Sequence, residues 1–496
     1  MKILLVTPEN RFIRAFRRGQ LNNFAQLTMA HLAGFVRPPH TVALVDEYVQ
    51  GVDLEAPADL VGITCNTPNA SHVYGLADAF RARGRMVVLG GPHPTLLPDE
   101  ARAHADALVI GEAETTWPQL LADAARGALA PEYRADEPPS LEGLPRPRRD
   151  LIVGRGLLAN AVIATRGCPH RCRYCNLRQI YAPALRFRPV EEVVAEVRGL
   201  RSPLFAFWDD QLFMDRGYAL RLFGALEGSN RRWAAMVTLA SARDERLLTA
   251  AARAGCVCLF LGLESFSARS LELANKSFNV VESYAEVVAR IHTHGITVQA
   301  GIVFGFDGDD EATFERTLVQ ATRLGLDGAT VSLLTPFPGT PLFQELQRAG
   351  RLLTQDWSYY NAKTAVTFRP ARMSPEALWN GYMWFRRQFF SRSCILERLR
   401  RSGVRPLQSL ALNWGYGRAI ENALPGWPIP RGERRAALDW PGGRLEDGCK
   451  TDFAGRGGSF RPPEGHGPVV PAATGGGSAA PSPPRSDSTP YGARPP

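Results

Sequence analysis

Short apolar segments alternate with helical hydrophobic patterns along the first 130 residues of the chain. Strands that alternate with helices in this way are typical of a parallel, doubly wound sheet, which binds ligands at the carboxyl ends of its strands. Residues 1–129 are therefore predicted to form an α/β domain of flavodoxin-like type. The predicted strands are Ile3–Thr7, Thr41–Asp46, Leu60–Cys65, Val87–Leu89 and Ala107–Ile110, and the predicted helices are Leu21–Phe35, His72–Arg83 and Thr116–Arg126.

A second series of alternating strands and helices begins at Ala159, after a proline-rich polar segment, 130–152, that is predicted to be a linker. Six strand–helix units are too few for a closed eightfold barrel. They fit an open, partial (β/α)6 barrel over residues 153–340, with its active site at the carboxyl ends of the strands. The predicted strands are Ala159–Thr165, Phe205–Asp209, Ala234–Leu239, Val257–Glu264, Thr297–Gly305 and Gly328–Leu334.

The remaining residues differ in composition from both domains. Residues 341–422 are mixed and rich in aromatic side chains, and they are predicted to form a small helical cap on the barrel. Residues 423–496 consist largely of Pro, Gly, Ser and Arg, a composition that predicts disorder.

Charge and cysteine content narrow the classes of function. The net charge of +9 comes mostly from arginine, without a dense basic stripe interleaved with aromatic residues, so nucleic-acid binding is not indicated. The eight cysteines are unevenly spaced and do not form a disulfide framework. The chain begins with a strand-like segment, and no apolar run reaches the length of about 18 residues that a membrane span needs. These features predict a cytoplasmic protein.

Three cysteines in one loop are the most informative chemical feature of the chain. Cys168, Cys172 and Cys175 follow the apolar run 159–164, so they are placed at the carboxyl end of a strand. A cubane iron–sulfur cluster ordinarily takes four thiolates, and three leave one iron open to a small molecule. The alternative is a structural zinc site with His170 as fourth ligand, although His170 lies between the first two cysteines, too close for the usual finger spacing.

The Cys-x3-Cys-x2-Cys spacing resembles the signature of the radical S-adenosylmethionine (SAM) enzymes. The resemblance implies a 4Fe–4S cluster whose open iron binds the methionine part of SAM, and reductive cleavage of SAM to a 5′-deoxyadenosyl radical. Further motifs at strand ends resemble the segments that contact SAM in this family. The implied cofactor-binding residues are Tyr174, Asp209, Asp210, Glu264, Ser265, Gly301, Val303, Gly305 and Thr335. For the two aspartates, a helix N-cap is an equally good interpretation.

The first domain resembles the cobalamin-binding modules that precede radical SAM domains in one large subfamily. The resemblance implies that small and hydroxyl residues at strand ends contact cobalamin. These residues are Thr64, Asn66, Thr67, Gly90, Gly91, His93, Gly111 and Glu112. Because Pro8-Glu9-Asn10-Arg11 stands where Asp-x-His-x-x-Gly would supply a lower cobalt ligand, either cobalamin binds without a protein imidazole or the module is only a scaffold. His93 is interpreted as structural.

The resemblance implies a class B radical SAM methyltransferase that methylates an unactivated carbon, or phosphorus, of a lipid, tetrapyrrole or natural-product intermediate. Its external electron donor would be a flavodoxin or ferredoxin. The alternatives are radical carbon–carbon coupling, ring contraction or rearrangement, and a non-enzymatic zinc or cluster-bearing binding protein. The oligomeric state is not indicated by the sequence.

Two segments have more than one interpretation. Cys256 and Cys258 are two residues apart on one strand, so they are predicted to share a face, either as buried small residues or as ligands. The aromatic and arginine-rich segment Tyr382–Phe390, followed by Arg398-Leu399-Arg400-Arg401, fits a helix at a membrane surface or a cap helix packed on the barrel with a solvated arginine face.

Overall fold

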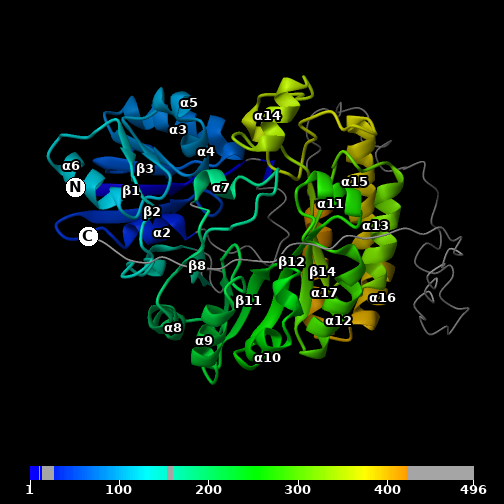
Figure 1. The fold of residues 1–496 in the computed structure, drawn as a ribbon. Helices are drawn as coiled ribbons and strands as arrows, with labels where there is room; N and C mark the ends of the chain where they lie inside the picture. The colour runs from blue at the N-terminus through cyan, green and yellow to red at the C-terminus, as the bar shows by residue number, and fades with distance from the viewer. Residues whose placement is uncertain (11, 14–26, 154–159, 182, 422–496) are drawn as a thin grey trace, which may run out of the picture. The chain divides into compact units, whose positions relative to one another are not determined.

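The computed structural model describes residues 1–10, 12–13, 27–153, 160–181 and 183–421 (Figure 1). The predicted disorder of residues 423–496 and the first part of the predicted helix Leu21–Phe35 lie outside the described residues. The described residues belong to one compact unit of the chain.

The first domain is a six-stranded, wholly parallel sheet in the order β2-β1-β3-β4-β5-β6. Its strands are β1 (Lys2–Thr7), β2 (Thr41–Asp46), β3 (Leu60–Thr64), β4 (Met86–Gly90), β5 (Ala107–Ile110) and β6 (Glu132–Arg134). The strand order reverses between β1 and β3, which is the switch point where doubly wound sheets bind ligands. This order confirms the flavodoxin-like prediction. The short strand β6 lies in the predicted linker, where three mostly polar residues carry no hydrophobic pattern.

Helices cover both faces of this sheet. They are α2 (Thr28–Ala33), α3 (Ala70–Arg81), α4 (Pro92–Leu96), α5 (Pro98–Arg102) and α6 (Thr116–Ala125). Two separate apolar cores result, one around Val73 and Phe80 of α3 and the other around Met29 of α2 and Trp117 of α6. All five residues of β3 are buried because the strand lies between these cores.

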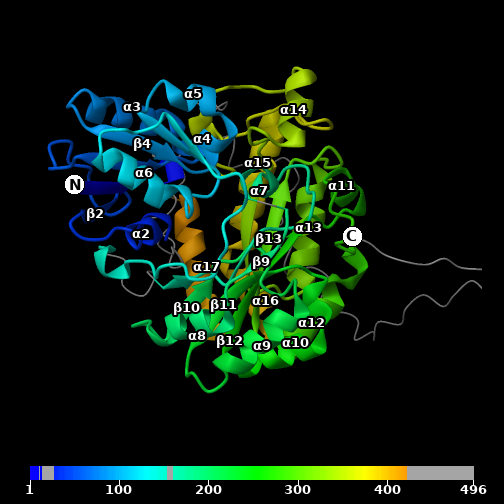
Figure 2. The ribbon, with the colours of Figure 1, turned by 60° about the vertical axis from the view of Figure 1, so that its left-hand side comes forward.

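The second domain is a six-stranded parallel sheet in the order β7-β10-β11-β12-β13-β14, as the prediction of a partial barrel requires. Its strands are β7 (Ala161–Val162), β10 (Leu204–Phe207), β11 (Arg232–Val237), β12 (Cys256–Glu264), β13 (Thr297–Phe304) and β14 (Gly328–Leu333). The outer helices are α8 (Val190–Arg198), α9 (Arg216–Leu226), α10 (Glu245–Arg253), α11 (Ala268–Leu273), α12 (Tyr284–Thr293) and α13 (Ala312–Arg323), and Figure 2 shows several of them along the outside of the strands.

The first strand of the barrel is shorter than the predicted Ala159–Thr165. The chain leaves the sheet after Val162, and Thr165–Arg166 instead forms β8, which pairs in antiparallel fashion with β9 (Arg186–Phe187). The cause is Asp209, whose buried carboxylate accepts hydrogen bonds from the backbone N–H groups of Ala164 (3.0 Å) and Thr165. These bonds replace the ladder bonds of a continuous strand and direct the chain toward the cysteines.

The pairing of β11 with β12 corrects the prediction for Cys256 and Cys258. Trp233 pairs with Cys256 and the next residue, Ala234, pairs with Cys258, so Val257 is the extra residue of a β-bulge. A bulge breaks the alternation of side chains along a strand. Cys256 accordingly packs in the apolar core, whereas Cys258 faces the interior of the barrel, in the cavity described below.

In the described part of the chain, the barrel is followed by the helices α14 (Pro341–Arg348), α15 (Pro375–Phe389), α16 (Arg392–Ser402) and α17 (Pro406–Glu421). All aromatic residues of α15 are buried, and so is Arg386. The membrane-surface interpretation of this segment is therefore wrong, and the predicted solvated arginine face is also absent at Arg386 and Arg398, the latter being fully buried over the ring of Phe389. Among the described residues, no helix is both long and apolar enough to span a bilayer.

Candidate active site

The cysteine loop is held in place by the segment that follows β12. The backbone N–H of Arg173 donates to the carbonyl of Ala274 (3.0 Å), and the Asn275 side chain donates to the carbonyl of Arg171 (2.8 Å). Asn275 has a φ of 54°, a left-handed conformation that asparagine tolerates better than most residues. The loop is thus fixed at both residues that flank Cys172.

The three thiols lie in one partly buried environment. Burial raises the pKa of all three, and the pKa of Cys175 reaches about 12. His170 stacks on the ring of Phe278, with ring centroids 4.0 Å apart. No set of three or more His, Cys, Asp or Glu side chains in the described ranges could hold a single metal ion. A cubane places each thiolate on a different iron, so its three cysteines do not need to converge on one metal ion.

The end of β12 places the carboxylate of Glu264 beside Gly262. Glu264 has a φ of 63° and follows a register shift between β12 and β13. Its carboxylate forms an ion pair with Lys276 (2.6 Å), and both side chains are largely buried. A Cβ on Gly262 would lie 2.7 Å from that carboxylate, so a larger residue there would displace the Glu264 side chain from its present position. The ammonium of Lys276 also faces the cysteine loop, since it lowers the pKa of Cys172 against the effect of burial.

The remaining SAM-motif residues surround the same strand ends. Gly305 has a φ of 111°, and its N–H donates to the buried carboxylate of Asp309 (2.9 Å). Ser265 and Thr335 are buried, and the Thr335 hydroxyl donates to the carbonyl of Leu333. The predicted residues Gly301 and Val303 lie on β13, and Tyr174 packs edge-on against Phe306 with ring centroids 5.8 Å apart.

The two aspartates after β10 have different surroundings. Asp209 is 1% exposed, and its oxygens accept backbone hydrogen bonds, so it shapes the chain instead of facing a ligand or capping a helix. Burial raises its pKa to about 7. Asp210 lines the cavity, where burial raises its pKa to about 6 against the opposing effect of Arg166.

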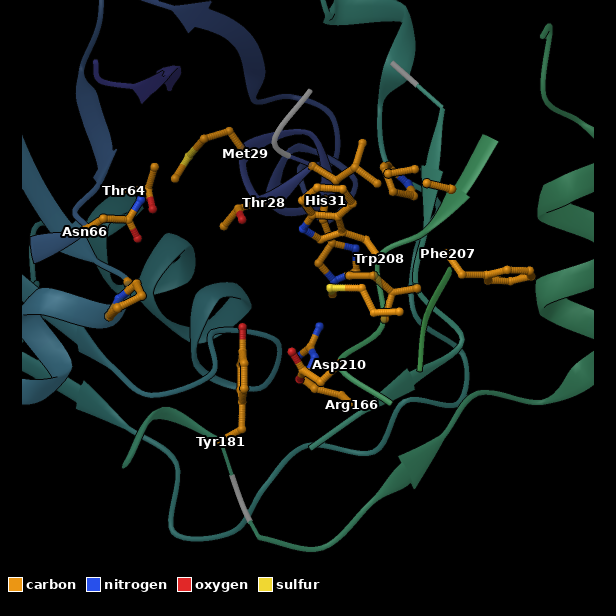
Figure 3. Close-up of a pocket in the computed structure, with 18 of the residues that line it drawn as sticks. Thr28, Met29, His31, Thr64, Asn66, Arg166, Tyr181, Phe207, Trp208 and Asp210 are labelled. Carbon is orange, nitrogen blue, oxygen red and sulfur yellow. The ribbon is translucent and has the colours of Figure 1, made fainter. Parts of the chain in front are cut away.

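A cavity of about 950 Å³ extends from the carboxyl ends of the first sheet into the interior of the barrel. Figure 3 shows Thr64, Asn66 and Met29 on one side of this space, with Trp208 and Arg166 on the other. Of the residues predicted to contact cobalamin, those that line it are Thr64, Asn66, Gly90, Gly91, Gly111 and Glu112. Thr67 and His93 do not line it. His93 is fully buried between Thr67 and Glu100, as its structural interpretation requires.

Glycines let the cavity reach the backbone at the strand ends of the first domain. A Cβ on Gly111 would meet no atom within 4 Å, and Gly91 adopts a φ of 105°, where a Cβ would lie 2.9 Å from the carbonyl of Cys65. After β1, Asn10 caps the chain at Phe12 and Ile13. The imidazole of His31, on α2, lines the cavity, and its Nε2 lies 3.4 Å from Oε1 of Glu114.

A buried charge network joins the first domain to the cysteine loop. Arg166, two residues before Cys168, pairs with Glu112 and Glu114 of the first domain, each at 2.6 Å. Arg186 makes a second bond to Glu112. Although burial opposes ionisation, His31 and Arg166 hold the pKa of Glu114 at about 2.

Sequence reasoning singled out Glu112 in this network but not its partners. Glu114 stands in the same strand-end motif as Glu112, but its role is not indicated there, and Arg166, Arg186 and His31 become recognisable only through their partners. The same holds for Lys276, the partner of Glu264. The adjacency of Arg166 to Cys168 is the one signal in the sequence that could have indicated it.

The donor set fits the cofactors that the sequence implies. Three thiols on one anchored loop suit a cluster with an open iron, and glycine-lined strand ends that open onto a large cavity suit a bulky cofactor lying against backbone.

Comparison with known proteins agrees with this site. Residues 162–321 match the model of the radical SAM superfamily, and residues 31–121 match that of the B12 binding domain. The chain is 30% identical, over 72% of its length and 78% of the relative, to bacteriochlorophyllide d C-12(1)-methyltransferase of Chlorobaculum tepidum. It is 27% identical, over 71% and 69%, to hopanoid C-2 methylase of Rhodopseudomonas palustris.

Solved structures share the fold. The methyltransferase TsrM from Kitasatospora setae, with cobalamin and a [4Fe-4S] cluster bound, has a TM-score of 0.61 at 16% identity, covering 77% of this chain and 88% of that one. The cobalamin-dependent radical enzyme OxsB has a TM-score of 0.63 at 15% identity, covering 78% and 67%. The chain belongs to the radical SAM superfamily, among the members with an N-terminal B12 binding domain, and is an enzyme whose cofactors are a 4Fe–4S cluster, SAM and cobalamin.

Proposed function

We propose that the enzyme transfers a methyl group to an unactivated carbon of a large, mostly apolar small molecule. The observation that carries this proposal is the continuous cavity between the strand ends of the B12 binding domain and the interior of the barrel. A substrate in that space lies between the two cofactor sites, which is the position that methyl transfer requires.

When bound, the cofactors supply the chemistry: the cluster provides the electron that cleaves SAM, and cobalamin carries the methyl group. The protein binds and orients them. In this proposal Cys168, Cys172 and Cys175 hold the cluster. The residues proposed to contact SAM are Tyr174, Asp210, Glu264, Ser265, Gly301, Val303, Gly305 and Thr335, and those proposed to contact cobalamin are Thr64, Asn66, Gly90, Gly91, Gly111 and Glu112.

The lining of the cavity supports a ring-bearing substrate. Small side chains, among them Ala161, Ala206 and Ala234, widen the barrel, and Trp208 and Phe260 offer flat apolar surfaces. Relatives of the chain are named as methylating a bacteriochlorophyllide and a hopanoid, which are both large ring systems. We therefore propose a tetrapyrrole or a polycyclic lipid as substrate class.

The cluster needs an external one-electron donor, and we propose a flavodoxin or ferredoxin in the cytoplasm. A cluster that must stay open to SAM requires a reducing compartment. Arg171, exposed between the cysteines, favours an acidic carrier at this surface.

The test is anaerobic reconstitution with iron, sulfide and hydroxocobalamin, followed by incubation with methyl-deuterated SAM, dithionite and a chlorin substrate. Methyl transfer predicts a deuterated product, together with S-adenosylhomocysteine and 5′-deoxyadenosine. 5′-Deoxyadenosine without a deuterated product would favour rearrangement or coupling. A protein that binds no corrinoid would refute the proposal.

A further inference from the structure

The deep end of the cavity carries polar groups that neither cofactor site uses. This polar wall consists of Gln299 of β13, Thr330 of β14, Lys363 of the loop before α15 and Tyr416 of α17. Gly301 and Val303, the residues of β13 that are proposed to contact SAM, lie nearer than Gln299 to the carboxyl end of the strand. Because side chains two apart share a face of a strand, Gln299 lies below Gly301 and Val303 on the face that looks into the barrel.

Lys363 brings a positive charge to this wall. Its ammonium donates to the carbonyl of Val331 and the hydroxyl of Ser332, each at 2.7 Å. No carboxylate among the described residues forms an ion pair with it. The loop is fixed, since Asn361 accepts from the Lys363 backbone N–H and Tyr382 donates to its carbonyl. Burial, together with Arg386 nearby, lowers the pKa of Lys363 to about 7.

Gln299 adds a donor without a partner. Its side chain lines the cavity and is 7% exposed, and its amide nitrogen has no hydrogen-bond partner within the described part of the chain. Gly328 pairs with Gln299 across the sheet, and a Cβ on Gly328 would lie 2.4 Å from that nitrogen. Glycine at this position therefore makes room for the amide. A buried donor is costly unless a ligand or a water satisfies it.

We propose that the polar wall binds a carboxylate of the substrate through Lys363 and Gln299. Both groups donate hydrogen bonds. The acidic side chains that line the cavity are Glu112, Glu114, Glu196 and Asp210, and the first three are already paired with arginines. The Thr330 and Tyr416 hydroxyls, 3.3 Å apart, complete the wall. The inference rests on the proposed function and narrows its substrate class to acids. Tetrapyrroles with propionate side chains belong to this class, whereas neutral polycyclic hydrocarbons do not.

The test compares an acid with its own ester. Pyropheophorbide a, a chlorin with one propionic acid, and its methyl ester are titrated into the full-length holoenzyme, and binding is followed by chlorin fluorescence. Oleanolic acid and its methyl ester serve as competitors with a different ring system. We expect each acid to bind at least about tenfold more tightly than its ester, as a charge-assisted hydrogen bond implies.

Lys363→Met is expected to abolish the preference for the acid, and Gln299→Leu to reduce it. Lys2→Met, at the exposed start of β1, is the matched control and retains it. If K363M does not fold, Q299L still tests the inference. Equal binding of acid and ester by the wild-type enzyme, for both ring systems, overturns it, and so does an undiminished preference in K363M. Absence of methyl transfer would refute the proposed function separately, because binding is measured without turnover.

Discussion

Replacing Arg166 by methionine tests whether the buried charge network stabilises the contact between the first domain and the cysteine loop. Arg166 is largely buried, with its side chain 12% exposed, and it bonds to Glu112 and Glu114, which are 5% and 7% exposed. Methionine keeps much of the side-chain volume but removes the charge. Glu112 retains Arg186 as a partner, whereas Glu114 retains only His31 in this network.

The expected loss of stability can be judged in two ways. The fall of the Glu114 pKa from 4.5 to about 2 corresponds to about 3 kcal/mol in favour of the buried carboxylate. Removing one partner of a buried ion pair typically costs about 3–5 kcal/mol. His31 also lowers the Glu114 pKa and remains in R166M, so the pKa shift sets an upper limit on the part due to Arg166. Because the pairs with both Glu112 and Glu114 are lost, we expect a destabilisation of about 3 kcal/mol at neutral pH.

The destabilisation of R166M depends on pH. In the wild type, the contribution of Glu114 is complete above about pH 4.5 and is lost as the pH falls toward 2. In R166M, burial raises the Glu114 pKa, so the carboxyl group can be protonated at moderately acidic pH. The difference between wild type and variant is therefore expected to be smaller at pH 5 than at pH 7.

Urea denaturation at both pH values, followed by tryptophan fluorescence, measures this difference. Arg148→Met is the control, because its pair with Asp150 is exposed and contributes less than about 1 kcal/mol. The double variant R166M/E114Q is expected to regain part of the loss, since no uncompensated carboxylate remains. The reasoning is refuted if R166M is as stable as R148M, or if E114Q does not restore stability.

Three further predictions concern the cysteine loop. Cys172→Ala is expected to remove the visible absorption of the cluster and all 5′-deoxyadenosine formation, because a thiolate ligand is lost. The control Cys256→Ala, in the apolar core, should leave both unchanged. Retained absorption in C172A would contradict the assignment. Asn275→Ala should lower the iron bound per chain more than Asn230→Ala, although both asparagines have a φ of 54°, because only Asn275 bonds to the loop. Because burial raises the pKa of Asp209, its contribution to the free energy of unfolding should fall as the pH rises from about 4 to 7. Asp209→Asn should flatten this pH dependence in thermal unfolding, and an unchanged slope would refute the prediction.

Local patterns were sufficient to predict most of the architecture. Parallel strands buried on both faces are nearly continuous apolar runs, and this property identifies β1, β3, β12 and β13 without any tertiary information. The cysteine loop was equally recognisable, because the three cysteines proposed to hold the cluster lie within eight consecutive residues. Departures from the predicted strands occur where a distant group acts on the backbone, as the Asp209 carboxylate does at Thr165.

By itself the sequence determined the two α/β domains, the cluster motif and the family of cofactors. Only the tertiary structure decided that Arg166 meets Glu112 and Glu114, that a bulge separates Cys256 from Cys258, and that Lys363 and Gln299 face one cavity. The physical reason is that hydrophobic periodicity and ligand spacing are properties of neighbouring residues. The pairs of Arg166 with Glu112 and Glu114 join residues 54 and 52 positions apart, so they depend on how the strands are ordered and where they end.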